Sequence, residues 1–225
     1  MRSVKPLLVT FSGLDGAGKS TQINHLRRQL ESAGLKVRTL AFWDDVAVGK
    51  RFREGFVHKV YGSEQGIGSP EKPVARRDKN VRAWYLTLAR CGFYLLDAIH
   101  LAEVVARARR GAPHVIIVDR YIYDEIVNLP LRNRFGRWFA RLLDSLTPRP
   151  DVPLLLDADP EAARARKPEY PLEFMRHARR KYIFVAELIR FIRVVPPLPL
   201  EEACRTVVNE VWRELAEAEG RAQAA

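Results

Sequence analysis

The sequence predicts an α/β fold in which helices flank an open, five-stranded parallel sheet. Two observations predict it: short apolar runs alternate with segments of helical periodicity, and a glycine-rich loop directly follows the first run. Several of the runs are continuously apolar, as expected for strands that are covered on both faces. The predicted strands are residues 7–11, 36–40, 115–118, 153–156 and 191–195.

Helical stretches fill the intervals between these strands and follow the last one. In the longest stretch, apolar side chains recur at helical spacing from Trp84 to Ala102. Strands that alternate with helices imply right-handed crossovers, and ligands of such sheets lie at the carboxyl ends of the strands. The tail after Ala216 is expected to fray. The predicted helices are residues 19–33, 74–110, 135–146, 172–190 and 200–218.

The composition suits a single domain that covers residues 1–225, with 47% hydrophobic and 29% charged residues. The formal net charge of +11 attracts phosphates of nucleotides, nucleic acids or lipids without choosing among them. Cys91 and Cys204 have no metal-binding spacing, which argues against a disulfide framework or a zinc site and predicts a cytoplasmic location. No apolar stretch reaches membrane-spanning length, so no membrane partner is expected.

The segment from Gly13 to Ser20, "GLDGAGKS", matches the pattern G-x-x-x-x-G-K-[ST], with a predicted strand before it and a helix after it. Glycines let backbone N–H groups surround an anion, and the helix presents its positive end to the same place. Lys19 would neutralise the β- and γ-phosphates of ATP, and the Ser20 hydroxyl would be a ligand of Mg²⁺. The predicted ATP-binding residues are Gly13, Asp15, Gly16, Ala17, Gly18, Lys19, Ser20 and Thr21.

This loop predicts a nucleoside triphosphate ligand but does not identify the reaction. A GTPase would need an N/T-K-x-D element that reads guanine, and the sequence has none. A motor ATPase or a helicase usually needs a longer chain and further motifs. A small kinase remains, and a kinase requires a second site for its acceptor.

Asp119 and Arg120 follow the third predicted strand in "VIIVDRYIYD", at the expected mouth of the crevice. Asp119 can hold Mg²⁺ or its waters, and Arg120 can bind a phosphate with both arms of its guanidinium. The alternative is an ion pair at the end of a strand, without any ligand.

These two motifs and a third segment, "LLLDADPEAARARKPEYPLEFMRHARRKYIFVAE" at residues 154–187, resemble the thymidylate kinase family of P-loop nucleoside monophosphate kinases. The resemblance implies the P-loop kinase fold with sheet order 2-3-1-4-5 and a short lid at about residues 160–175. It also implies transfer of the ATP γ-phosphate to a nucleoside monophosphate. Homodimers are usual in the family, so a homodimer is possible here.

An arginine that stabilises charge on the transferred phosphoryl group lies either in the glycine loop or on the lid of such kinases. The loop of this sequence has no arginine, so the lid type is implied, with Arg164 and Arg166 as candidates. By resemblance, Asp15 would contact the sugar hydroxyl of the acceptor or a Mg²⁺-bound water. Its alternative role is to stabilise the turn. The predicted catalytic residues are Lys19, Asp15, Arg120, Arg164 and Arg166.

The acceptor-binding region, expected at about residues 42–98, departs from the family. Where the family has an Arg-Glu-Pro-Gly-Gly-Thr segment, this sequence reads "AFWDDVAVGKRFREGF". Farther along, Arg90, Tyr94 and Asp97 share one helical face and could stack on and read a base, or they could be ordinary surface residues. The predicted acceptor-binding residues are Trp43, Arg53, Arg90, Tyr94, Asp97 and Arg120.

The resulting prediction is an ATP- and Mg²⁺-dependent nucleoside monophosphate kinase that acts on dTMP or a related monophosphate. One alternative is a kinase of the same fold with a deoxynucleoside or another small phosphate as acceptor. Another is a nucleic-acid-associated ATPase, which the dispersed basic residues and the lack of a nucleic-acid-binding motif do not favour. The expected partners are therefore small nucleotide substrates.

Overall fold

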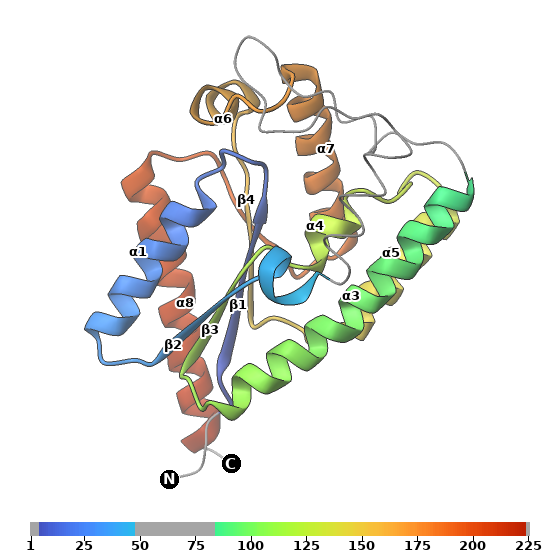
Figure 1. Ribbon diagram of the computed structural model, residues 1–225. Helices are drawn as coiled ribbons and strands as arrows, with labels where there is room; N and C mark the ends of the chain where they lie inside the picture. The colour runs from blue at the N-terminus through green and yellow to red at the C-terminus, as the bar shows by residue number, and fades with distance from the viewer. Residues whose placement is uncertain (1–4, 48–83, 224–225) are drawn as a thin grey trace.

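The computed structural model describes residues 5–47 and 84–223 (Figure 1). In this part of the chain, five strands form one parallel sheet in the predicted order, β2-β3-β1-β4-β5. The register pairs Phe11 of β1 with Asp119 of β3, and Gly13 of β1 with Leu156 of β4. The strands are β1 (Leu7–Gly13), β2 (Val37–Ala41), β3 (Val115–Asp119), β4 (Val152–Leu156) and β5 (Arg193–Val195).

Four of the five predicted helices are confirmed along nearly their whole length, and the 74–110 helix is confirmed from Trp84 onward, because residues 74–83 lie outside the described part. Three short elements were not predicted as helices: η1, which is a single π-helical turn, α4 and α6. The helices are α1 (Lys19–Ser32), η1 (Phe42–Val46), α3 (Trp84–Arg110), α4 (Ile122–Ile126), α5 (Arg134–Leu146), α6 (Pro160–Arg166), α7 (Leu172–Leu188) and α8 (Leu200–Gln223).

Helices cover both faces of the sheet (Figure 1). In β1, Val9 and Phe11 are buried against α1 and α8, whereas Leu8 belongs to the cluster that includes Leu101 of α3 and Ile126 of α4. Alternate side chains of one strand thus enter two different cores, which explains why the strands are continuously apolar in sequence.

The expectation that the chain frays after Ala216 is wrong, because α8 continues to Gln223. Glu214 accepts hydrogen bonds from Arg193 of β5 at 2.6 Å and from Arg221 at 2.9 Å. The bond from Arg193 joins α8 to β5, and the bond from Arg221 connects the last turns of the helix to the same carboxylate, so contacts that apolar periodicity does not encode stabilise the helix end.

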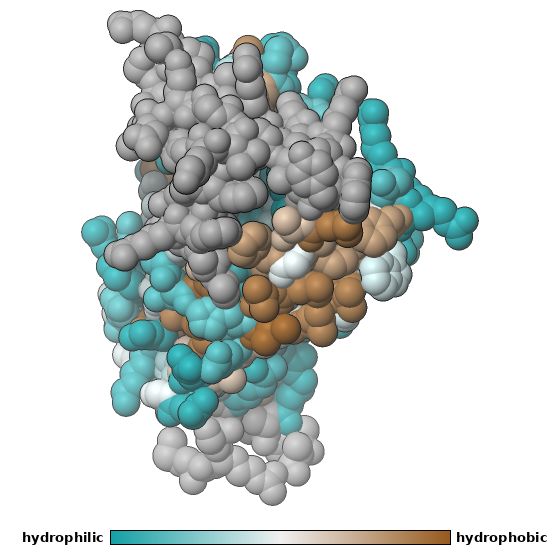
Figure 2. Space-filling view, turned by 45° about the vertical axis from the view of Figure 1, so that its right-hand side comes forward, coloured by the Kyte–Doolittle hydropathy of each residue, from teal (hydrophilic) through white to brown (hydrophobic). Residues whose placement is uncertain are grey.

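Large apolar side chains are exposed along the outer sides of α3 and α5, where Figure 2 shows them gathered together. We call them the α3–α5 apolar surface, and they are Leu88, Leu96, Ile99, Phe135, Trp138 and Leu146. None of the helices in the described residues is both long and apolar enough to cross a membrane.

Candidate active site

The glycine loop joins β1 to α1 at the carboxyl end of the sheet, where the sequence predicts it. Gly16 has a left-handed φ of 80°, and a Cβ atom there would lie 2.2 Å from the backbone oxygen of Ala163 in α6. A Cβ atom on Gly13 would lie 2.5 Å from the backbone oxygen of Leu156. The loop therefore needs glycine for its turns and for the close approach of β4 and α6.

Lys19 is only 7% exposed, and its Nζ donates hydrogen bonds to the backbone oxygens of Gly13 and Leu14, each at 2.8 Å. Burial, followed by repulsion from Arg120, lowers the pKa of Lys19 to about 8. The charge of Lys19 thus lies inside the loop and is poorly solvated, so an anion bound there would stabilise it. Ser20 and Thr21 are exposed at the start of α1, where backbone N–H groups have no helical partner.

Asp119 ends β3 beside β1, and its Oδ1 is buried without a hydrogen-bond partner among the described residues. Burial raises the pKa of this carboxyl, although Lys19 and Arg120 oppose the shift. A buried carboxylate oxygen without a partner suits Mg²⁺ or a Mg²⁺-bound water. No cluster of three metal-binding side chains occurs in residues 5–47 and 84–223.

Arg120 connects β3 to the glycine loop. Its backbone has a left-handed φ of 66°, and its N–H donates to the Phe11 oxygen at 2.9 Å. Its Nη2 donates to Asp15 in the loop, and its Nη1 donates to Asp124 at 3.1 Å. Burial opposes the charge of Arg120, but Asp124 and Asp15 raise its pKa further above the ordinary value. The predicted ion pair at the strand end therefore exists, and it points Arg120 at the predicted phosphate site.

Asp124, which the sequence analysis did not single out, links three parts of the fold. Its Oδ2 accepts from the Ser12 hydroxyl at 2.6 Å and from the Tyr121 N–H at 3.2 Å. Its Oδ1 accepts from the Tyr182 hydroxyl of α7 at 2.8 Å as well as from Arg120. The only sequence signal was a carboxylate four residues after Arg120, which is common on helix surfaces.

The predicted lid consists of α6, a short connection and the first turn of α7. The Nε of Arg164 donates to the Tyr170 oxygen at 3.1 Å and closes this connection. Arg176 of α7 pairs with Glu161 of α6. Through Nε and Nη2, Arg179 donates to both oxygens of Asp157, each at 2.7 Å. These contacts tie α6 to α7, and α7 in turn to Asp157, which directly follows β4.

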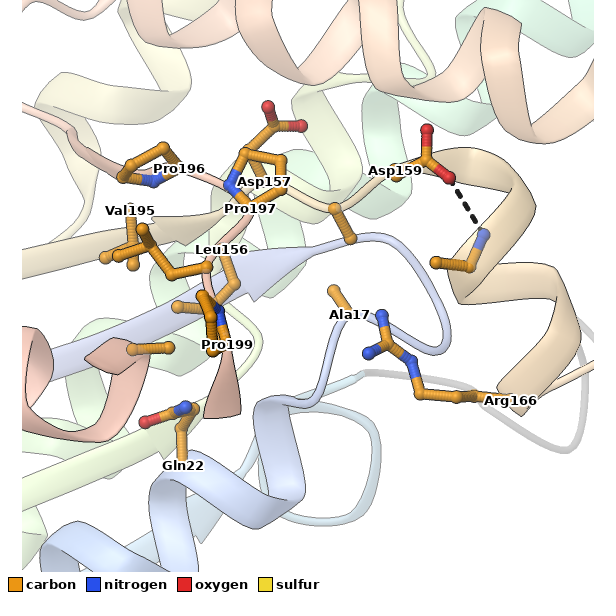
Figure 3. Close-up of a pocket in the computed structure, with 14 residues that line it drawn as sticks. Ala17, Gln22, Leu156, Asp157, Asp159, Arg166, Val195, Pro196, Pro197 and Pro199 are labelled. Carbon is orange, nitrogen blue, oxygen red and sulfur yellow. Dashed lines mark hydrogen bonds between the residues drawn. The ribbon is translucent and has the colours of Figure 1, made fainter. Parts of the chain in front are cut away.

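A cavity of about 290 Å³ lies between the glycine loop, α6 and the segment that follows β5 (Figure 3). Ala17, Leu156 and Val195 give it apolar walls, and Pro196, Pro197 and Pro199 extend them. Arg166 lines this cavity, whereas Arg164 does not.

Gln22 of α1 also lines the cavity, although the sequence analysis did not single it out. It is 3% exposed, and its Oε1 is buried without a hydrogen-bond partner among the described residues. A buried amide oxygen that lacks a partner can accept a hydrogen bond from a ligand in the cavity.

The predicted acceptor residues occupy different environments. Trp43 in η1 is 39% exposed and packs edge-to-face on Phe42. On α3, Tyr94 and Asp97 are 5% and 0% exposed, so these two are not ordinary surface residues. Arg53 lies outside the described residues. Base recognition by this group stays a prediction.

No protein-family model matches the chain. Among curated proteins, it is 25% identical over 214 residues to a "Probable thymidylate kinase" of Methanosphaera stadtmanae, covering 93% of this chain and 99% of the relative. It is 28% identical over 218 residues to the corresponding protein of Thermococcus gammatolerans, covering 93% and 97%. It is 29% identical over 223 residues to a "Thymidylate kinase" of Bifidobacterium longum, covering 93% and 98%.

These similarities extend over nearly the whole of each chain, and the glycine loop, the Asp119–Arg120 pair and the lid occur in the predicted order on the predicted sheet. The segment after β2, which carries Trp43, Asp44 and Asp45, is the part expected from the sequence to depart from the family, and this expectation stays a prediction. The chain is thus similar over nearly its whole length to curated thymidylate kinases, and this similarity supports the thymidylate kinase family and indicates a phosphotransferase.

Proposed function

We propose that the protein transfers the γ-phosphate of ATP to a nucleoside monophosphate, with dTMP as the first candidate and Mg²⁺ as the cofactor. The observation that carries this proposal is the bond from Arg120 to Asp15, because it joins an acceptor-side arginine to the loop that would hold the donor phosphates. The curated relatives to which the chain is similar are named thymidylate kinases, which supports the same acceptor.

Each residue has a physical task in this reaction. Lys19 and the start of α1 hold the donor phosphates, and Arg120 turns from Asp15 to the phosphate of the acceptor. Arg164 and Arg166 contribute positive charge from the lid, which also keeps water from the phosphoryl group. The reaction needs no general base, because the phosphate of the acceptor is already an anionic nucleophile.

Ser20 and Asp119 are the residues that would hold Mg²⁺. When bound, the ion supplies positive charge to the phosphate oxygens.

The cavity beside the loop is the proposed site of the adenine ring. Its proline and aliphatic walls can contact both faces of a flat base, and the guanidinium of Arg166 can stack on it. Gln22 can accept a hydrogen bond from an exocyclic amino group.

The acceptor would lie between residues 42–98 and Arg120, near the predicted residues Trp43, Arg53, Arg90, Tyr94 and Asp97. A panel of nucleoside monophosphates, deoxynucleosides and small phosphates, read by ADP release, tests this directly. We expect turnover with dTMP to exceed that with the other compounds. Turnover no greater than with water alone would exclude dTMP and leave the alternative of another acceptor.

The substitution Lys19→Ala tests whether the protein is an enzyme or a nucleotide-binding scaffold without catalytic activity. The substitution removes the only lysine of the loop and should lower turnover by at least about 100-fold, since electrostatic stabilisation of this kind is worth several kcal/mol. A matched substitution, Lys36→Ala, lies at the opposite end of the sheet and should leave turnover unchanged.

ATP hydrolysis that depends on DNA or RNA and needs no small acceptor would favour the nucleic-acid-associated ATPase instead.

We also propose a homodimer that uses the α3–α5 apolar surface, because large apolar side chains exposed side by side favour association. A cytoplasmic location stays part of the proposal. Cys91 and Cys204 are buried free thiols, which suits a reducing compartment.

A further inference from the structure

We propose that Asp124 is a positioning residue that orients Arg120 toward the phosphate of the acceptor and links it to α7. This inference rests on the proposed function, since it takes Arg120 as the residue that receives this phosphate. Asp124 itself would not touch either substrate.

The surroundings of the Asp124 side chain support a positioning role. The side chain is 2% exposed, and each oxygen accepts two hydrogen bonds from the four donors described above. Ser12 belongs to β1, immediately before the glycine loop, whereas Tyr182 belongs to α7. A buried carboxylate bound on all sides has one orientation, so the guanidinium that it holds is oriented with it.

Arg120 depends on such an anchor. Its left-handed backbone costs about 1 kcal/mol or more for a residue with a Cβ atom, so surrounding contacts must maintain it. Of its two carboxylate partners, Asp15 is 23% exposed and lies in the loop that would hold phosphates, while Asp124 is buried. An incoming phosphate can displace Asp15 from Nη2, and Asp124 then keeps Nη1 in place.

Tyr182 extends this arrangement toward the lid. It lies on the same helix as Arg176 and Arg179, which bind Glu161 of α6 and Asp157 at the end of β4. The position of α7 therefore affects both the lid and the carboxylate that holds Arg120. We infer that removal of the Tyr182 hydroxyl weakens acceptor binding although it touches no substrate.

Two variants and one matched control test this role. Asp124→Asn keeps the shape of the side chain but removes its charge, and Tyr182→Phe removes one donor. Tyr123→Phe is the control, because Tyr123 is a buried tyrosine whose hydroxyl faces a different aspartate, Asp144, at 3.5 Å. Thermal unfolding of each variant establishes that it is folded before kinetics are compared.

With the best monophosphate acceptor of the panel, Asp124→Asn should raise the KM of the acceptor about tenfold or more, as expected for a charge-assisted hydrogen bond. Tyr182→Phe should raise it several-fold, and both should leave the KM of ATP within about twofold. In an Arg120→Met background, Asp124→Asn should cause no further change, because both substitutions act through one guanidinium. Equal changes for both substrates, or additive effects in the double variant, would overturn the inference.

If the wild-type protein phosphorylates none of the acceptors, the proposed function fails. The positioning role of Asp124 is then tested without activity, by hydrogen exchange of the Arg120 guanidinium. Its ¹⁵N–¹H signals, assigned by their loss in Arg120→Lys, should exchange with water at least about tenfold faster in Asp124→Asn than in the wild type or in Tyr123→Phe. Unchanged exchange in Asp124→Asn would overturn the role of Asp124 independently of any activity.

Discussion

At the scale of single residues, Gly16 shows how one missing side chain joins the phosphate loop to the lid. Its φ of 80° and its proximity to the Ala163 oxygen are two separate requirements for glycine. Gly34, at the end of α1, shares only the first, because its φ is also 80° but a Cβ atom there would meet nothing within 4 Å. Substitutions at Gly16 and Gly34 therefore distinguish the effect of backbone strain, which both share, from the effect of the contact with α6, which only Gly16 makes.

Both Gly16→Ala and Gly34→Ala should lose roughly 1–2 kcal/mol of stability from backbone strain. Only Gly16→Ala should also push α6 away and weaken ADP binding by at least about tenfold. Isothermal titration with ADP, together with thermal unfolding, measures both effects. Equal ADP affinity in the two variants would mean that the contact with Ala163 is not important for the site.

The two lid arginines also differ at this scale. Arg166 lines the cavity proposed for adenine, whereas Arg164 bonds the Tyr170 oxygen. Arg166→Ala should therefore weaken ADP binding several-fold through the lost stacking contact. Arg164→Ala should change ADP binding less and turnover more, because it loosens the lid connection. ADP titrations and steady-state rates measure the two effects. If Arg164→Ala weakens ADP binding more and Arg166→Ala lowers turnover more, the two arginines have the opposite roles.

At the scale of elements, the long helices and the strands follow from sequence periodicity, but the short helices do not. The five residues of α4 are too few to show a helical period, and its first turn is held by Asp124, whose side chain accepts from the Tyr121 N–H. The end of α8 is likewise held by ion pairs between elements distant in sequence. Such contacts join residues of different elements, so no local sequence pattern predicts them.

The end of α8 can be tested by substitution and by pH. Although burial opposes it, bonds from Arg193 and Arg221 lower the pKa of Glu214 below 4.5. The stabilisation is therefore present above pH 4.5 and is lost as the pH falls through the lowered pKa. At pH 7, Glu214→Gln should speed amide hydrogen exchange in residues 216–223, and at low pH it should match the wild type.

Glu217→Gln is the control for this experiment. Glu217 meets the same Arg221 at a longer distance of 3.9 Å and is 55% exposed, so its loss should change exchange little. If both variants exchange alike at pH 7, the bridge from β5 does not hold the helix end.

At the scale of the whole molecule, the α3–α5 apolar surface lies on the outer sides of α3 and α5, whereas the glycine loop lies between β1 and α1 (Figure 1). Association through this surface would therefore leave the glycine loop accessible. A two-fold symmetric interface uses the same surface of both subunits. A single substitution that adds a charge to this surface would therefore place two like charges in the interface.

Ile99→Glu tests the proposed homodimer, since Ile99 is 59% exposed on α3. Light scattering after size-exclusion chromatography should give the mass of a dimer for the wild type and that of a monomer for this variant. Trp212→Glu, which adds a charge on α8 on the opposite side of the sheet, should leave the dimer intact. A wild-type protein that stays monomeric at high concentration would exclude the proposal.

The sequence by itself determined the parallel sheet, the long helices and the phosphate loop, because each depends on local periodicity or on neighbouring residues. It also placed Asp119 and Arg120 at the sheet edge, since parallel strands present their carboxyl ends together. Only the tertiary structure decided that Asp124, Ser12 and Tyr182 meet and that Arg166 and Gln22 share a cavity. The residues in these contacts come from elements distant in sequence, and packing, which no local pattern encodes, brings them together.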